Sequence, residues 1–177
     1  MHKIQLACTC GKVRLDASGE PIITTECHCN SCREAGALLT AFEGAPASVF
    51  PNGGTPFVMM RKDRVHFVAG MEHLKAYRLP GSSTRRVIAI CCNTPVFLEF
   101  KGGHWLSLYK SIWPEGAMPP VELRTMLSDL ADPAVLDDTV PGGKRQSWGF
   151  YARLLGAWIA MGFRSPKIEV EQEGVLR

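Results

Sequence analysis

Short alternating runs of apolar and polar residues dominate the first two thirds of the chain. This period of two predicts half-buried β-strands. The runs lie around Val13 and Leu15, over Val65–Ala69, over Val96–Phe100 and over Trp105–Tyr109. The last two flank Gly102-Gly103, which predicts a hairpin, and Pro51-Asn52-Gly53-Gly54 predicts a loop. We therefore expect a mainly β body of short strands and turns.

A helical spacing begins after Pro119-Pro120. There Leu123, Met126, Leu127 and Leu130 fall at i, i+3, i+4 and i+7, which predicts a helix that ends before Pro133. A loop at Pro141-Gly142-Gly143 precedes an apolar stretch from Ser147 to Phe163, which predicts a second helix. We expect a β domain over residues 1–115 and a helical C-terminal extension over residues 116–177, packed on that domain.

Arg153 is the only charged residue of the second helix, so the helix needs an apolar surface to pack against. One face is shared by Trp148, Tyr151, Leu155, Trp158 and Ile159. We expect this face to be buried against the β body or against a second subunit in a homodimer, because it is too apolar to leave in water. The alternative is a helix on a membrane surface, with Lys144, Arg145 and Arg164 at its ends.

Composition narrows the function classes. A length of 177 residues suits one domain, and a net charge of +3 with scattered basic residues does not indicate nucleic-acid binding. Seven cysteines cannot all pair, and Met1-His2-Lys3 does not open a signal-peptide pattern. We therefore expect a cytoplasmic protein whose reduced, clustered cysteines are metal ligands rather than disulfides.

The cysteines form three clusters, Cys8-Thr9-Cys10-Gly11, Cys27-His28-Cys29-Asn30-Ser31-Cys32 and Cys91-Cys92. Zinc prefers thiolates, and ligands two or three residues apart can surround one ion through a tight turn. The central cluster offers three thiolates and leaves one position for another ligand. A vacancy would suit a small thiol substrate, whereas a fourth protein ligand would make a structural site. His28 is the local candidate, but in an extended loop its side chain points away from its neighbours, which favours a polar loop residue.

These blocks resemble the glutathione-dependent formaldehyde-activating enzymes and the related centromere protein V. The family pattern is C-x-C-G, then C-H-C-x-x-C-R, then C-x-x-C-G-T-P. The first two blocks match at Cys8–Gly11 and Cys27–Arg33. The third is present only as Cys92-Asn93-Thr94-Pro95, because Ala89 stands where the pattern has its other cysteine. The resemblance covers roughly residues 3 to 110.

The resemblance implies a β-tent of stacked antiparallel sheets with two zinc ions. Cys8, Cys10 and Cys92 would belong to a structural zinc site, whose fourth ligand is left open between Cys91, water and nothing. Cys91 cannot simply replace the lost cysteine if it faces the opposite side of a strand from Cys92.

Cys27, Cys29 and Cys32 would hold the catalytic zinc. The implied activity is that of a zinc-dependent carbon–sulfur lyase acting on a small thiol adduct such as S-(hydroxymethyl)glutathione. The alternative is a non-enzymatic zinc-stabilised binding module whose extension contacts a protein or a membrane. Arg33, Arg85 and Arg86 could meet carboxylates of glutathione, although solvated surface is the expected role of each.

Overall fold

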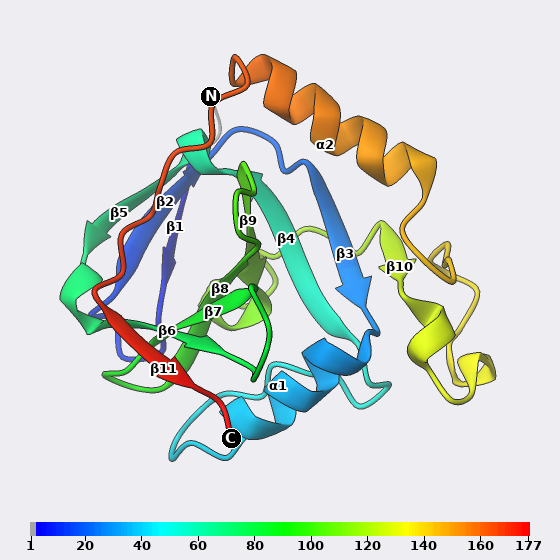
Figure 1. The fold of residues 1–177 in the computed structure, drawn as a ribbon, viewed down its shortest axis with the longest axis horizontal. Helices are drawn as coiled ribbons and strands as arrows, with labels where there is room; N and C mark the ends of the chain where they lie inside the picture. The colour runs from blue at the N-terminus through cyan, green and yellow to red at the C-terminus, as the bar shows by residue number, and fades with distance from the viewer. Residues whose placement is uncertain (1–2) are drawn as a thin grey trace.

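The computed structural model describes residues 3–177 as two β-sheets with helices at their rims (Figure 1). The smaller sheet is antiparallel, in the order β1-β2-β5, and its strands are Lys3–Ala7, Arg14–Ser18 and Val65–Ala69. The larger sheet has the order β10-β3-β4-β9-β8-β7-β6-β11. In that order its strands are Leu123–Thr125, Ile23–Cys27, Thr55–Arg61, Trp105–Tyr109, Thr94–Glu99, Arg85–Ala89, Leu74–Arg78 and Gln172–Val175. The prediction of a mainly β fold is confirmed.

The core lies between the two sheets. Leu15, Ala17 and Val65 contribute to it from the smaller sheet, and Val58, Met60, Val87, Val96, Leu106 and Leu108 from the larger one. Successive side chains of a strand point to opposite faces. The intervening residues of the larger sheet, among them Phe57, Met59, Arg86, Leu98 and Ser107, therefore point to its other face. That second face carries the candidate site.

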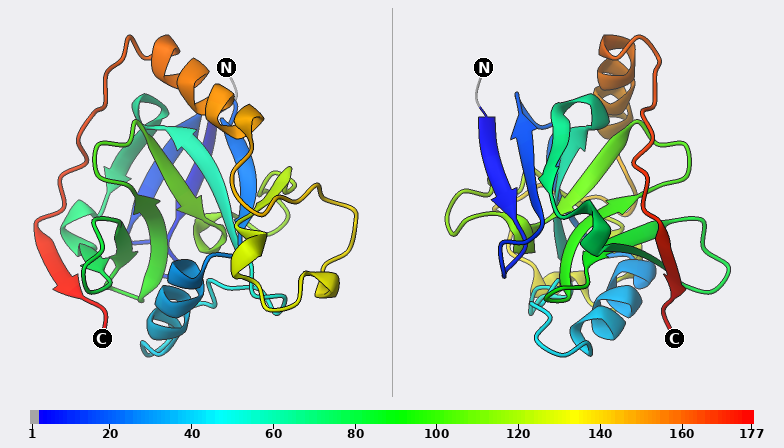
Figure 2. Two further views of the ribbon diagram at one scale, coloured as in Figure 1. Left: turned by 45° about the vertical axis from the view of Figure 1, so that its right-hand side comes forward. Right: turned by 90° about the vertical axis from the view of Figure 1, so that its left-hand side faces the viewer.

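Two α-helices lie at opposite ends of the larger sheet (Figures 1 and 2). Helix α1 is Asn30–Thr40, directly after β3, and α2 is Trp148–Ala160. Short 3-10 helices cover Lys62–Arg64, Met71–His73, Lys110–Ile112, Leu127–Asp129 and Pro133–Val135. Within residues 3–177, none of the helices has both the length and the apolar character that a membrane crossing requires.

The first predicted helix is wrong. Residues Leu123–Thr125 instead form strand β10, parallel to β3. Arg124 exchanges both backbone hydrogen bonds with the following loop, donating to Pro141 and accepting from Gly143. Met126 then takes a left-handed conformation with φ 61°, which ends any regular run. Tertiary pairing therefore overrides the helical spacing of the apolar residues.

The extension begins and ends as edge strands of the larger sheet. Strand β10 pairs with β3 at one edge, and β11 pairs in parallel with β6 at the other. Between them, α2 crosses the rim near the ends of β3 and β4, and the chain then descends to β11 (Figure 2). Residues 116–177 therefore share a sheet with the preceding residues and are not helical throughout.

Helix α2 forms where predicted, but with another face buried. Ser147 caps it, because its hydroxyl accepts a hydrogen bond from the Phe150 amide at 3.2 Å. Phe150 and Leu154 pack on Ile23 and Met59 of the sheet. The face that we expected to be buried is exposed in this chain: Trp148 91%, Tyr151 51%, Leu155 51%, Trp158 38% and Ile159 53%. The helix is apolar on nearly every side, so the spacing of its apolar residues did not identify the packed face.

Candidate metal centres and the adjoining cavity

The fold gathers all seven cysteines into two groups. One contains Cys8, Cys10, Cys91 and Cys92, and the other contains Cys27, Cys29 and Cys32. Within each group the sulfur atoms lie within 4.8 Å of one another, and all seven thiols are free. The six predicted ligands are therefore divided between two places as expected, and Cys91 joins the first.

The four-thiol group joins two turns that are distant in sequence. Cys8 and Cys10 follow β1, in a turn that Gly11 closes by donating its amide to the Cys8 carbonyl at 2.9 Å. Gly11 has φ 75°, a conformation that glycine adopts without steric cost. Cys91 and Cys92 lie between β7 and β8, where Asn93 takes φ 53° as the residue following the ligand pair. Asparagine tolerates this left-handed conformation better than most residues.

The structure brings Cys91 beside the three cysteines predicted for the first site. We assumed that Cys91 and Cys92 lie on a strand, but β7 ends at Ala89. The Cys92 amide donates to the Ala89 carbonyl at 3.2 Å in a turn, which brings both sulfur atoms to the same group. Ala89 itself is fully buried in the core. A thiol two positions after Ala89 therefore lies where it could serve as the fourth ligand.

The sulfur spacing of this group fits zinc. Tetrahedral coordination with Zn–S bonds of about 2.3 Å places the sulfur atoms about 3.8 Å apart. The Sγ–Sγ distances are 3.6 Å for Cys8–Cys10, 3.4 Å for Cys10–Cys91, and 3.9 Å for both Cys8–Cys91 and Cys91–Cys92. Four thiolates would complete the coordination sphere of one ion.

The three-thiol group is built on the start of α1. Cys27 ends β3, Cys29 is the N-cap residue of the helix, and Cys32 lies in its first turn. The Cys32 amide donates to the Cys29 sulfur at 3.3 Å, so the spacing of these two residues is that of a helix cap. Negative charge is favoured at a helix N-terminus, and the first turn carries no acidic side chain that would oppose it.

The thiols of the central group do not ionise alike. Hydrogen bonding from Cys27 and Cys32 lowers the pKa of Cys29 to about 2. Hydrogen bonding to Cys29 raises the pKa of Cys27 to about 11, and hydrogen bonding with Cys27 and Cys29 raises that of Cys32 well above its ordinary value. Ionisation is therefore favoured at Cys29 and opposed at Cys27 and Cys32, and a cation beside the group would favour the ionised form of all three. A divalent, thiophilic ion would have this effect.

His28 is not a member of this group. Its side chain is fully buried, and Nε2 lies 2.8 Å from Oε1 of Glu26. Glu26 is also within 3.4 Å of Arg124 Nε, and the His28 amide donates to the Thr125 carbonyl at 3.0 Å. These contacts fix the chain between Cys27 and Cys29 against β10. The interpretation of His28 as a residue that points away from the thiols agrees with the structure, but the residue is buried rather than solvated.

Arg86 corrects another expectation, because it is 1% exposed instead of forming solvated surface. Its Nη2 donates to the carbonyl and the hydroxyl of Ser31, at 3.1 and 2.8 Å. Its Nε and Nη1 are buried and have no hydrogen-bond partner among residues 3–177. The guanidinium charge also contributes to the lowered pKa of Cys29. Sequence reasoning named Arg86 but missed its burial, which follows from its position on the face of β7 that lines the cavity, opposite to the face of Val87.

A cavity of about 670 Å³ opens beside Cys27, Cys29 and Cys32. Its floor is the second face of the larger sheet, with Phe57, Met59, Leu98, Trp105 and Ser107, and Arg86 also lines it. The extension supplies Met126, Asp129, Gln146, Phe150, Tyr151 and Leu154. The three-thiol group therefore faces a mainly apolar space, part of whose wall comes from α2.

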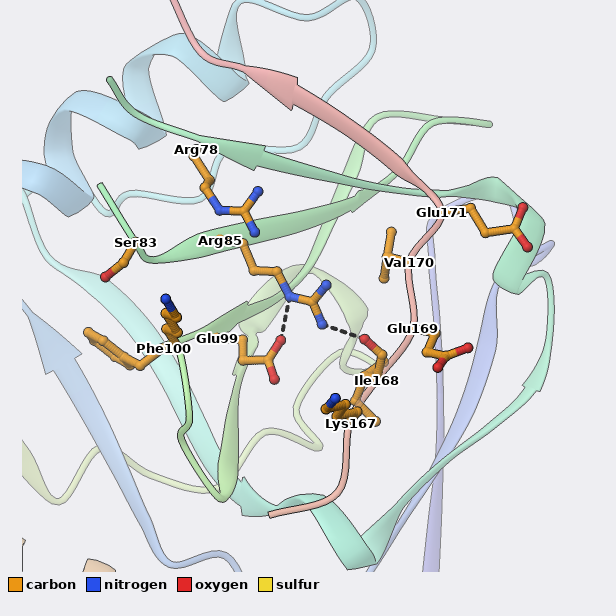
Figure 3. Close-up of a pocket in the computed structure, with 11 residues that line it drawn as sticks. Arg78, Ser83, Arg85, Glu99, Phe100, Lys167, Ile168, Glu169, Val170 and Glu171 are labelled. Carbon is orange, nitrogen blue, oxygen red and sulfur yellow. Dashed lines mark hydrogen bonds and ion pairs between the residues drawn. The ribbon is translucent and has the colours of Figure 1, made fainter. Parts of the chain in front are cut away.

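A second cavity, of about 710 Å³, has no cysteine or histidine among the described residues that line it (Figure 3). Arg85 crosses it to Glu99 and to the carbonyl of Ile168, and Lys62 also pairs with Glu99. Arg85 therefore anchors the chain that leads to β11. Arg33 is likewise engaged within the chain, because its Nη2 donates to the Asp129 carbonyl at 2.7 Å.

Comparison with known proteins places these features in a family. Residues 3–109 match the sequence model of the glutathione-dependent formaldehyde-activating enzymes. A comparison with curated proteins found no match. Among solved structures, a crystal structure of a Rhodobacter sphaeroides protein is similar with a TM-score of 0.47 and 16% identity, covering 79% of this chain and 100% of that one. The family match spans more than half of the chain and includes both cysteine groups, so the chain belongs to the glutathione-dependent formaldehyde-activating enzyme family.

Proposed function

We propose that the chain binds zinc at both cysteine groups and is a carbon–sulfur lyase that acts on a small thiol adduct at Cys27, Cys29 and Cys32. One observation carries this proposal: the central group has three thiols and faces a cavity, whereas the other group has four. Structural zinc sites are closed by four protein ligands, and catalytic sites commonly keep one position for a substrate or water.

Zinc, when bound, would supply a coordination position that attracts a thiol sulfur and lowers the pKa of that thiol. Cys27, Cys29 and Cys32 would hold the other three positions. Three thiolates around a divalent ion leave one net negative charge, and the buried guanidinium of Arg86 would balance it. The α1 N-terminus would further stabilise the thiolates of Cys29 and Cys32.

Family membership supports glutathione and formaldehyde as a substrate pair. In the synthetic direction the glutathione sulfur forms a bond to the formaldehyde carbon, and the carbonyl π electrons move to oxygen. That oxygen takes a proton, while the thiol proton is released. In the lyase direction the carbon–sulfur bond breaks, the alcohol loses its proton and the thiol is regenerated. No oxidant or reductant is needed.

NMR exchange between free and adducted glutathione tests the proposal without a coupling enzyme. The zinc-loaded protein should exceed the spontaneous exchange rate, and Cys32→Ser should abolish the excess. Wild-type protein stripped of the more labile zinc and then reloaded is the matched control, and its excess rate should return. A central zinc closed by a fourth protein ligand that no thiol displaces would overturn the lyase proposal.

A non-enzymatic binding module is the second candidate, favoured by the exposed aromatic face of α2. Trp148 is 91% exposed and Trp158 is 38% exposed. Replacing both Trp148 and Trp158 by serine should leave glutathione exchange unchanged if the lyase proposal holds. If exchange is absent in the wild type, and the same double variant loses binding to anionic lipid vesicles or loses self-association, the binding-module function is favoured.

A further inference from the structure

The cavity beside the central cysteines is larger and more apolar than formaldehyde requires. Its volume of about 670 Å³ falls in the range of roughly 300–1,000 Å³ that is typical of sites for drug-sized ligands. Phe57, Leu98 and Trp105 line it from the sheet. A one-carbon aldehyde joined to a sulfur atom would leave most of this surface without a partner. The bulk of the ligand must therefore belong to the rest of the thiol compound.

Helix α2 contributes a wall that lies outside the family match, which ends at residue 109. Phe150 and Leu154 line the cavity and are only 9% and 7% exposed, because they are held against Ile23 and Met59. The wall is therefore fixed in place by packing. Tyr151 lines the same cavity from the next position of the helix and stays half exposed.

The charged side chains that line the cavity also indicate which ligands it can bind. Among residues 3–177, Arg86 and Asp129 are the only arginine, lysine, aspartate or glutamate side chains that line it. Arg86 donates hydrogen bonds to the carbonyl and hydroxyl of Ser31, which lies between Cys29 and Cys32, so its charge lies near the sulfur end. Glutathione has two carboxylates and an ammonium group, more charges than Arg86 and Asp129 could pair, and a charge buried against apolar side chains without a partner is costly. An uncharged hydrocarbon body gains free energy from the same surface.

We propose that the central site prefers a thiol with an apolar, aromatic or branched aliphatic body, and that α2 sets this preference. The proposal rests on the proposed function in one respect: the thiol sulfur must reach the metal held by Cys27, Cys29 and Cys32. In this arrangement the sulfur atom of the substrate lies at the cysteines, and its apolar body packs against Phe150 and Leu154.

Cobalt substitution measures the preference without relying on turnover. The full chain loaded with Co²⁺ is titrated with 2-phenylethanethiol and with glutathione, and the sulfur-to-cobalt absorption reports each new thiolate ligand. We expect 2-phenylethanethiol to bind at least about tenfold more tightly, since small apolar contacts in a pocket typically change affinity 10- to 200-fold. Cys32→Ser should remove the response to both thiols.

Two adjacent leucines of α2 give a matched pair of variants. Leu154 lines the cavity, whereas Leu155 is 51% exposed and does not. Leu154→Gln should weaken 2-phenylethanethiol binding about tenfold and leave glutathione unchanged. Leu155→Gln should change neither. If thermal melting shows that Leu154→Gln is not folded, Tyr151→Ala decides the question, because Tyr151 lines the cavity but is half exposed.

The outcomes separate this proposal from the proposed function. Equal affinity for the two thiols, or equal weakening of both by the folded cavity variants, overturns the role of α2 and leaves the lyase intact. Failure of every thiol to alter the cobalt spectrum overturns the lyase proposal itself. Selective loss of 2-phenylethanethiol binding in Leu154→Gln or Tyr151→Ala, with Leu155→Gln unchanged, supports the assignment.

Discussion

The two cysteine groups use the same ligand type in opposite settings. The four-thiol group joins the turn after β1 to the turn between β7 and β8, across a sequence separation of 83 residues between Cys8 and Cys91. The three-thiol group is local, since Cys27, Cys29 and Cys32 lie at one β3–α1 junction. A metal at the first group would close a long loop, and a metal at the second would add little to the order that the helix already provides.

The surroundings of the two cysteine groups differ as well. Beside the four-thiol group, the hydroxyls of Thr9 and Thr94 lie 2.7 Å apart, and burial of Cys8 raises the pKa of its thiol. The three-thiol group has the buried guanidinium of Arg86 and a cavity of about 670 Å³. Ligand number and environment, rather than ligand type, therefore suggest a structural role for one group and a chemical role for the other.

The largest difference that we expect between the two cysteine groups is in their contribution to folding stability. Cys8→Ser should lower the free energy of unfolding by about 4–5 kcal/mol, the value for a cross-link that closes a loop of this length. Cys32→Ser should cost about 2 kcal/mol or less, since the loop that it helps to close is short. Urea unfolding with zinc analysis measures both. Equal losses, or a larger loss in Cys32→Ser, would contradict the assignment of roles.

Zinc release gives the next largest contrast. With a chelator in excess, the two zinc ions that we expect should leave in two phases, the faster from Cys27, Cys29 and Cys32, because a site with an open position lets a chelator attach first. A thiol-sensitive zinc dye would follow the release. The Cys32→Ser protein should retain only the slow phase. Persistence of the fast phase in that variant would assign the labile ion to the four-thiol group instead.

Sequence patterns predicted the strands better than the contacts between distant elements. Alternation identified β5 and β9, and the glycine pair identified the hairpin between β8 and β9. The helical spacing around Leu127 was misleading because β10 pairs with β3, a contact that local spacing does not encode. The buried face of α2 was also missed, because a helix that is apolar on most sides gives no directional signal.

At the candidate site, too, local features were predicted from the sequence and features that depend on tertiary packing were not. Spacing alone was enough to identify the three central cysteines, because their geometry is set by one helix cap. The place of Cys91 in the four-thiol group depends on where β7 ends, and a shift of one or two residues in that boundary changes the expected direction of its side chain. The burial of Arg86 depended on which face of β7 it occupies. Boundaries and faces are fixed by tertiary packing, so they could not be read with certainty from the pattern.

Arg86 and Arg85, which are adjacent in sequence, allow a controlled test of what sets the zinc affinity of the central group. Arg86→Met should weaken zinc binding at the central group by about tenfold, the lower end of the range for groups that contact metal ligands indirectly. The reason is that the variant removes the positive charge beside Cys29. Arg85→Met is the control, because Arg85 pairs with Glu99 in the other cavity (Figure 3). Competition with a zinc chelator measures both, and equal effects of the two substitutions would refute the role of Arg86.

The smallest effect concerns the residue that departs from the family pattern. Ala89→Cys restores the family spacing, yet it should not add zinc or stability, because Cys91 already completes the four-thiol group. Ala89 is fully buried and pairs with Thr94 and Leu74, so an added sulfur would overpack the core by about 1 kcal/mol or more. A fall in melting temperature of roughly 2–4 °C with unchanged zinc content is expected. Calorimetry beside elemental analysis tests this. A clear rise in melting temperature would show that the ligand supplied by Cys91 is the weaker one, and that Ala89 marks a real loss.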